Sequence, residues 1–137
     1  MQRIRKGVIV EAEKIVVELT APSEVKYTLE TVPVDETPEG EIITEDVYAA
    51  IIPVTYVVKK TTTFPLPNSG TIEFWDSVTE RTREFDFEVD KKCTIDLTVG
   101  DTKPLPSTVT IRATAYIPGF VFKAEGSSEV KVKMVPG

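Results

Sequence analysis

The chain has 137 residues, of which 41% are hydrophobic and 28% charged, with a formal net charge of −6. This length suits one domain, which buries enough surface to fold without disulfides or metals. The acidic balance argues against nucleic acid and anionic membranes as partners, because both are bound through clusters of Lys and Arg. No stretch of the sequence approaches the roughly 20 apolar residues that a membrane-spanning helix needs.

Val and Ile dominate the apolar residues and Thr is abundant, which favours β-sheet because β-branched side chains pack well on a pleated surface. Cys93 is the only cysteine, so no internal disulfide can form. The absence of a recognisable signal peptide adds to this and predicts folding in a reducing cytoplasm. Asn68 is the only asparagine and Gln2 the only glutamine. This poverty in thermolabile amides, beside many Lys and Glu, predicts a thermophilic source.

The N-terminal half is predicted to hold strands at residues 7–19, 25–29 and 47–60. The first is two strands, or one strand with a bulge near residues 11–13. The second is half-buried, with Val25, Tyr27 and Leu29 facing inward. The third is the most apolar run and predicts burial on both faces, with Pro53 at a bulge or an edge because proline cannot donate to a ladder.

A long acidic break is predicted over residues 33–46, which include Pro38 and Gly40. It carries six carboxylates and no basic residue: Asp35, Glu36, Glu39, Glu41, Glu45 and Asp46. Carboxylate oxygens are calcium ligands, but their spacing here does not match the EF-hand pattern. The preferred interpretation is a solvated or partner-facing loop, with a metal site as the alternative.

Alternation continues after residue 70. Residues 72–75 and 84–89 predict paired strands joined by a turn at residues 76–81, and residues 93–99 predict a strand containing Cys93 as a buried structural thiol. A proline loop follows at residues 103–107. The predicted core includes Phe85, Phe87, Ile95, Leu97, Val109 and Ile111.

The last third predicts a three-stranded meander. Its strands are residues 109–115, a return at residues 120–124 after the Pro118-Gly119 turn, and residues 130–134 after a turn at residues 125–128. The pattern Thr108-Val109-Thr110-Ile111-Arg112-Ala113-Thr114-Ala115-Tyr116, followed by Ser128-Glu129-Val130-Lys131-Val132, resembles the end of an immunoglobulin-like or fibronectin-III-like sandwich. The resemblance covers about a fifth of the chain and departs from the antibody Cys…Trp…Cys pattern, since Trp75 precedes the one cysteine.

These elements predict an all-β fold: one antiparallel β-sandwich domain of about eight or nine strands over residues 1–137. The resemblance implies an immunoglobulin-like arrangement, and a jelly roll is the alternative. Residues 1–6 are interpreted as a basic N-terminal arm.

Catalytic chemistry finds little support in the sequence. The chain has no histidine, which excludes serine–histidine and cysteine–histidine systems within it. Four acids share a strand face or lie beside it, as glycosidase carboxylates do: Glu84, Asp86, Glu88 and Asp90. Four basic residues flank them: Arg81, Arg83, Lys91 and Lys92. A solvated outer face is the preferred interpretation, so no catalytic, cofactor-binding or metal residue is assigned.

The sequence therefore predicts a non-enzymatic structural protein that acts through protein–protein contacts. A virion component made in a host cytoplasm is preferred: a capsid decoration, auxiliary or tail protein of a virus or phage. The alternatives are a cell-surface or secreted adhesion module for protein or carbohydrate and, last, a carboxylate-dependent hydrolase. The partner is another copy or a larger protein assembly, not nucleic acid or membrane. The predicted contact residues are Arg3, Ile4, Arg5, Lys6, Val8, Asp35, Glu36, Glu39 and Glu41.

Overall fold

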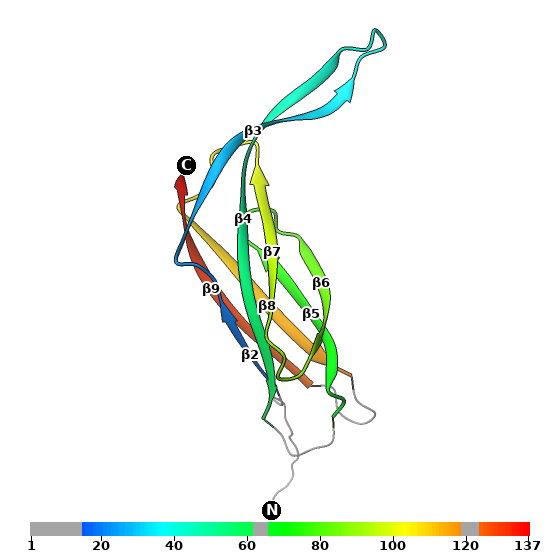
Figure 1. Cartoon of the computed structure of the whole chain (residues 1–137), viewed down its shortest axis with the longest axis vertical. Helices are drawn as coiled ribbons and strands as arrows, with labels where there is room; N and C mark the ends of the chain where they lie inside the picture. Colours follow the sequence, from blue (N-terminus) through cyan, green and yellow to red (C-terminus); the bar gives the residue numbers. More distant parts are fainter. Residues whose placement is uncertain (1–14, 62–65, 119–123) are drawn as a thin grey trace, which may run out of the picture.

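The computed structural model describes residues 15–61, 66–118 and 124–137, and within these ranges it contains strands and no helix (Figure 1). The eight strands are β2 (Ile15–Thr20), β3 (Glu24–Glu36), β4 (Ile42–Lys60), β5 (Ser69–Asp76), β6 (Thr82–Glu88), β7 (Cys93–Asp101), β8 (Thr108–Ile117) and β9 (Ala124–Pro136). The all-β prediction is confirmed. The strand predicted at residues 7–10 and the Pro118-Gly119 turn with its return strand lie outside the described residues, wholly or in large part. No helix in the described part is long and apolar enough to cross a membrane.

The hydrogen-bonded strand order is β2-β4-β3-β9-β8-β5-β6, and β7 pairs with β4 off this path. Every pairing is antiparallel except that of β3 with β9. β3 changes neighbours along its length, because residues 24–27 pair with β9 and residues 28–36 pair with β4. It thus connects a group formed by β2, β4 and β7 to a group formed by β9, β8, β5 and β6.

One hydrophobic cluster draws side chains from both groups of strands. At its centre Phe74 of β5 is fully buried, and its ring lies 5.3 Å from that of Tyr56 on β4 and 5.9 Å from that of Phe85 on β6. Four of the six predicted core residues are buried: Phe87, Leu97, Val109 and Ile111. Phe85 and Ile95 are partly buried and pack against the cluster.

β4 corrects one prediction and confirms another. Its side chains alternate between buried and exposed, as in Ile52 at 0% and Ile51 at 60% exposure, so the strand is not buried on both faces. β2 pairs with β4 no further than Thr55, and β3 pairs with it only up to Ala49. Pro53 therefore lies where β4 has β7 on one side and a local edge on the other, and the edge prediction is confirmed.

The predicted acidic break over residues 33–46 is wrong, because β3 continues to Glu36 and β4 begins at Ile42. A register shift between Pro33 and Asp35 accommodates the proline within the strand. The connection is a short turn in which Gly40 has a φ of 88° and donates its N–H to the Thr37 carbonyl at 2.9 Å. The acids therefore lie on a hairpin rather than on an irregular loop.

The three-stranded meander is also wrong, since residues 125–128 are part of β9 and pair with β8. Gly126 had suggested a turn, but it serves a close approach instead. A Cβ atom at this position would lie 2.5 Å from the carbonyl oxygen of Ile15, so glycine lets β2 cross closely over β9.

Candidate functional site

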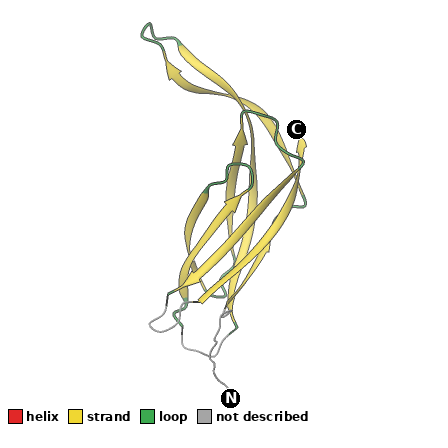
Figure 2. Ribbon diagram, turned by 180° about the vertical axis from the view of Figure 1, so that it is seen from behind, coloured by secondary structure: helices red, strands yellow, loops and turns green. Residues whose placement is uncertain are grey.

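The candidate site is the β3–β4 hairpin, which we define as residues 28–36 of β3, residues 42–49 of β4 and the turn between them. Its register runs from Thr28 opposite Ala49 to Glu36 opposite Ile42. The hairpin extends beyond the body formed by the other strands (Figures 1 and 2). No residue from 28 to 49 is buried, so this element contributes nothing to the fully buried core.

Along residues 28–36 and 42–47, both long edges of the hairpin lack a neighbouring strand among the described residues. β9 pairs with β3 only as far as Tyr27, and β7 pairs with β4 only from Tyr48 onward. Unpaired strand edges present rows of N–H and C=O groups that can pair with another chain. The hairpin is therefore open to strand addition on either side.

The hairpin also exposes large apolar side chains. Leu29 and Val34 are each 53% exposed, Ile42 is 65% exposed and Ile43 is 44% exposed. Side chains alternate along a strand, so Ile42 lies on the side of β4 that forms the core farther along, at Ile52. The apolar side of the sheet thus continues onto the hairpin, where no described strand covers it.

The hairpin is uniformly acidic. It carries no Lys or Arg and seven carboxylates: Glu30, Asp35, Glu36, Glu39, Glu41, Glu45 and Asp46. The hairpin's charge of −7 is therefore more negative than the net charge of −6 of the whole chain. Within the described residues none of them has an ion-pair partner. No group of three metal-ligating side chains is close enough to hold a metal ion in the described part of the chain. The metal alternative for residues 35–46 therefore gains no support.

The predicted contact residues divide into two sets. Asp35 and Glu36 end β3, while Glu39 and Glu41 lie in the turn, and all four are exposed at the far end of the hairpin. The other set lies outside the described residues: Arg3, Ile4, Arg5, Lys6 and Val8. Sequence reasoning missed the exposed apolar residues of the hairpin. The signal was a pair of apolar runs, at Val32 and Val34 and at residues 42–43, on either side of a Pro/Gly turn.

The protein families and structures already known provide no further guide. No family model, curated protein or solved structure matches this chain. The function of the hairpin must therefore be inferred from its own geometry and charge.

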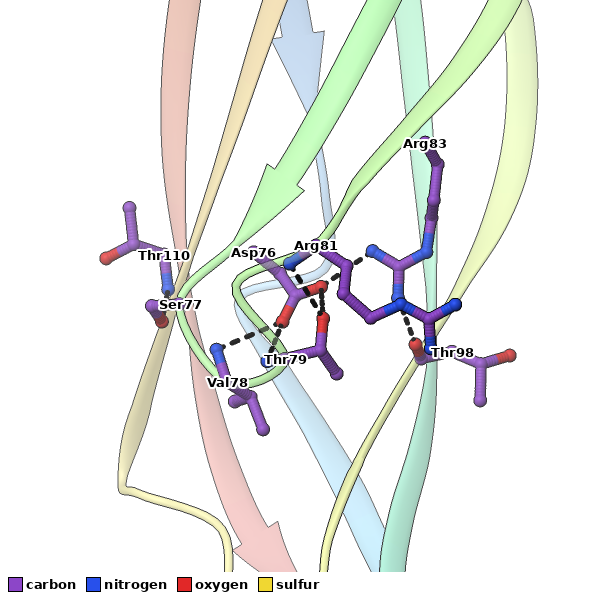
Figure 3. Close-up of polar contacts among 8 residues, drawn as sticks. All are labelled: Asp76, Ser77, Val78, Thr79, Arg81, Arg83, Thr98 and Thr110. Atoms are coloured by element: carbon purple, nitrogen blue, oxygen red, sulfur yellow. Dashed lines mark hydrogen bonds and ion pairs between the residues drawn. The ribbon is translucent and has the colours of Figure 1, made fainter.

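A second polar cluster centres on Asp76, a fully buried carboxylate at the end of β5 (Figure 3). One oxygen accepts the backbone N–H groups of Val78 at 3.0 Å and Thr79 at 2.7 Å. The other accepts the Thr79 hydroxyl at 2.7 Å and the Arg83 guanidinium at 2.6 Å. Arg83 also donates to the Thr98 carbonyl of β7 at 2.6 Å. The cluster therefore ties the β5–β6 turn to β7.

The Asp76 cluster is electrostatically satisfied within the chain. Burial alone would raise the pKa of the Asp76 carboxyl, but hydrogen bonds from Arg83 and Thr79 and the Arg83 charge hold its pKa below the usual range. The carboxylate thus stays ionised and accepts four hydrogen bonds from the chain, which is the arrangement of a structural clamp. In the sequence Arg83 is noted only as one of the basic residues that flank the acids of residues 84–90, and the structure pairs it with Asp76.

Cys93 lies at the start of β7, opposite Tyr56 of β4. It is partly buried and packs against the core cluster, so the buried structural thiol expected from the sequence is confirmed only in part. It lines an open hollow together with Phe87, Glu88 and Lys91. Burial raises the pKa of the Tyr56 hydroxyl, and the neighbouring Cys93 raises it further. The hydroxyl therefore stays protonated beside the thiol.

Proposed function

We propose that the chain is a non-enzymatic structural protein that assembles through protein–protein contacts, with the β3–β4 hairpin as its contact element. The observation that carries this proposal is that the hairpin combines exposed large apolar side chains with two unpaired edges, outside the core. A two-stranded ribbon without further packing is only marginally stable in water. A strand added by a partner would satisfy the edge groups and cover the apolar side chains.

The most specific form of this proposal is a virion component: a capsid decoration, auxiliary or tail protein of a virus or phage. Such a protein must contact a neighbour without disturbing its own core. The hairpin can do so because none of its residues is buried. Its uniform negative charge would set orientation and association rate, while the apolar residues would supply affinity.

For the body, the finer proposal is an antiparallel sandwich of the immunoglobulin-like kind. Support comes from the core cluster, to which the group around β4 and the group around β8 both contribute side chains, and from the contact between the rings of Tyr56 on β4 and Phe74 on β5. An experimental structure in which the two groups pack with strands aligned within about 30° would support this proposal. A closed ring of hydrogen-bonded strands would contradict it.

The contact role is tested by shortening the hairpin. Residues 31–46 are replaced by Asn-Gly, which joins the register partners Glu30 and Val47 through a two-residue turn. Sedimentation velocity should show loss of self-association or of attachment to the larger assembly. The thermal midpoint should change little, because none of the removed residues is buried.

A matched pair of single substitutions provides the control. Ile43 and Val16 are both 44% exposed, but only Ile43 lies on the hairpin. Ile43→Ser should weaken assembly and Val16→Ser should not. Full assembly by the shortened protein would show that the contact element lies elsewhere.

A further inference from the structure

The hairpin's charge restricts what can occupy its edge. Two hairpins of this chain facing each other would set seven carboxylates against seven, and like charges placed opposite one another destabilise a strand pair. The occupant must therefore carry positive charge, together with apolar side chains that match those exposed on the hairpin.

We infer that this occupant is the N-terminal segment of a second copy, residues 1–10, added as a strand to the hairpin edge. This inference rests on the proposed function and names its partner. Residues 1–6 contain Arg3, Arg5 and Lys6 and no acid, and the apolar residues Ile4, Val8, Ile9 and Val10 accompany them. Elsewhere in the chain no stretch of six residues combines three positive charges with no negative one.

The period of two along a strand divides both elements into two sides. In the N-terminal segment Arg3, Arg5 and Ile9 fall on one side, and Ile4, Lys6, Val8 and Val10 fall on the other. On the hairpin Glu30, Ile43 and Glu45 share one side, and Leu29, Glu36, Ile42 and Asp46 share the other. Both sides of the segment therefore combine positive charge with apolar side chains, and both sides of the hairpin combine carboxylates with exposed apolar side chains. A strand added to the β4 edge can set its arginines on the side of Glu45 and its Lys6 on the side of Asp46.

The contact comes from a second copy because the segment is too short to lie along its own hairpin as a strand. β2 begins at Ile15, opposite Lys60, at the end of β4 away from the hairpin, and runs toward the hairpin. Val47, opposite Glu30, is 13 residues farther along β4, or about 43 Å away, and the turn at residue 42 is about 60 Å away. Lys6 and Arg3 precede Ile15 by 9 and 12 residues, and at the maximum of about 3.6 Å per residue they reach about 32 and 43 Å. Only the first three residues could therefore touch the base of the hairpin.

The contact joins opposite ends of the body. Two antiparallel copies can make it reciprocally in a two-fold dimer, and copies in head-to-tail order extend it into a filament or close it into a ring. Exposed charges contribute to this contact, so it should weaken as added salt screens them.

Charge exchange between two full-length variants tests the inference. The first variant carries Arg3→Glu, Arg5→Glu and Lys6→Glu, and the second carries Glu30→Lys, Glu36→Lys and Glu45→Lys. Each alone sets like charges together, and its association constant should fall by roughly tenfold or more. Mixed in equal amounts, the two should assemble, because every contact then joins opposite charges. A control with Glu84→Lys, Asp86→Lys and Glu88→Lys, on exposed β6 positions, should assemble like the unchanged chain.

The outcomes separate this inference from the proposed function. Loss of assembly in the second variant alone, with the first assembling normally, overturns the inference and leaves the hairpin as the contact element. Normal assembly by both variants overturns both. Cross-linking provides a second measurement, with Ile4→Cys in one chain and Ile42→Cys in another, both carrying Cys93→Ala. Mild oxidation of the mixture should yield disulfide-linked heterodimers, and their absence contradicts the inference.

Discussion

Removal of the Asp76 carboxylate should destabilise the fold more than loss of any exposed acid. Asp76→Ala leaves the Arg83 guanidinium, which is 24% exposed, without its ion-pair partner. It also leaves two turn N–H groups and the Thr79 hydroxyl without an acceptor. Breaking one side of a buried pair costs about 3–5 kcal/mol. For a urea m-value of about 2 kcal/mol per M, the unfolding midpoint should fall by about 2 M.

The matched control is Asp96→Ala, an exposed aspartate on β7. It should change the free energy of unfolding by about 0.5 kcal/mol or less. Urea titrations followed by circular dichroism compare both variants with the unchanged chain. Equal losses in the two variants would refute the clamp role of Asp76.

The pH dependence provides a second readout of the same group. The folded-state pKa of Asp76 is lowered relative to the unfolded chain, whose aspartates titrate near pH 3.9. The contribution of Asp76 to stability is therefore complete above about pH 4 and is lost as the pH falls through the folded-state pKa. The stability difference between the unchanged chain and Asp76→Ala should shrink in that acidic range, and a constant difference would contradict the pKa shift.

Three further predictions concern the core, the thiol and the strand crossing. Ile111→Ala should lower the free energy of unfolding by about 2–5 kcal/mol through lost burial and a cavity, whereas Glu129→Ala, which loses only exposed ion pairs, should cost about 1 kcal/mol or less in the same urea titration. Cys93 should react with a thiol reagent more slowly in the native protein than in denaturant, and equal rates would show an accessible thiol. Gly126→Ala should lower the thermal midpoint, with a cost of about 1–3 kcal/mol, because its Cβ would meet the Ile15 carbonyl; an unchanged midpoint would show that β2 does not pack there.

Local alternation predicted much of the fold. The inward positions of β6, β7 and β8 follow from a strict period of two, and the structure buries or half-buries them as expected. The predictions failed where one residue type serves two roles. Pro33 and Gly126 suggested breaks, but Pro33 lies at a register shift within β3 and Gly126 at a close approach of β2 to β9.

The sequence predicted the acidic residues of the candidate site, but it did not predict the hairpin that carries them or its exposed apolar side chains. Asp35, Glu36, Glu39 and Glu41 were selected because acids without basic neighbours are conspicuous in a sequence. Exposure of Ile42 and Ile43 was not predictable in this way, since an apolar residue beside a strand is ordinarily expected in the core. These apolar residues lie outside the core because β4 extends beyond the ends of its neighbours β2 and β7. The relative lengths of the strands are a property of the whole sheet and are not visible in a local sequence pattern.

Backbone amide hydrogen exchange along the hairpin tests the central claim most directly. The unpaired N–H groups at the outer edges of residues 28–36 and 42–47 should exchange rapidly in the isolated protein and slowly in the assembled one. Amides of the buried strands β5 and β8 should show the same protection in both states. Protection that appears elsewhere on assembly, with the hairpin exchanging as before, would contradict the assignment of the hairpin as the contact element.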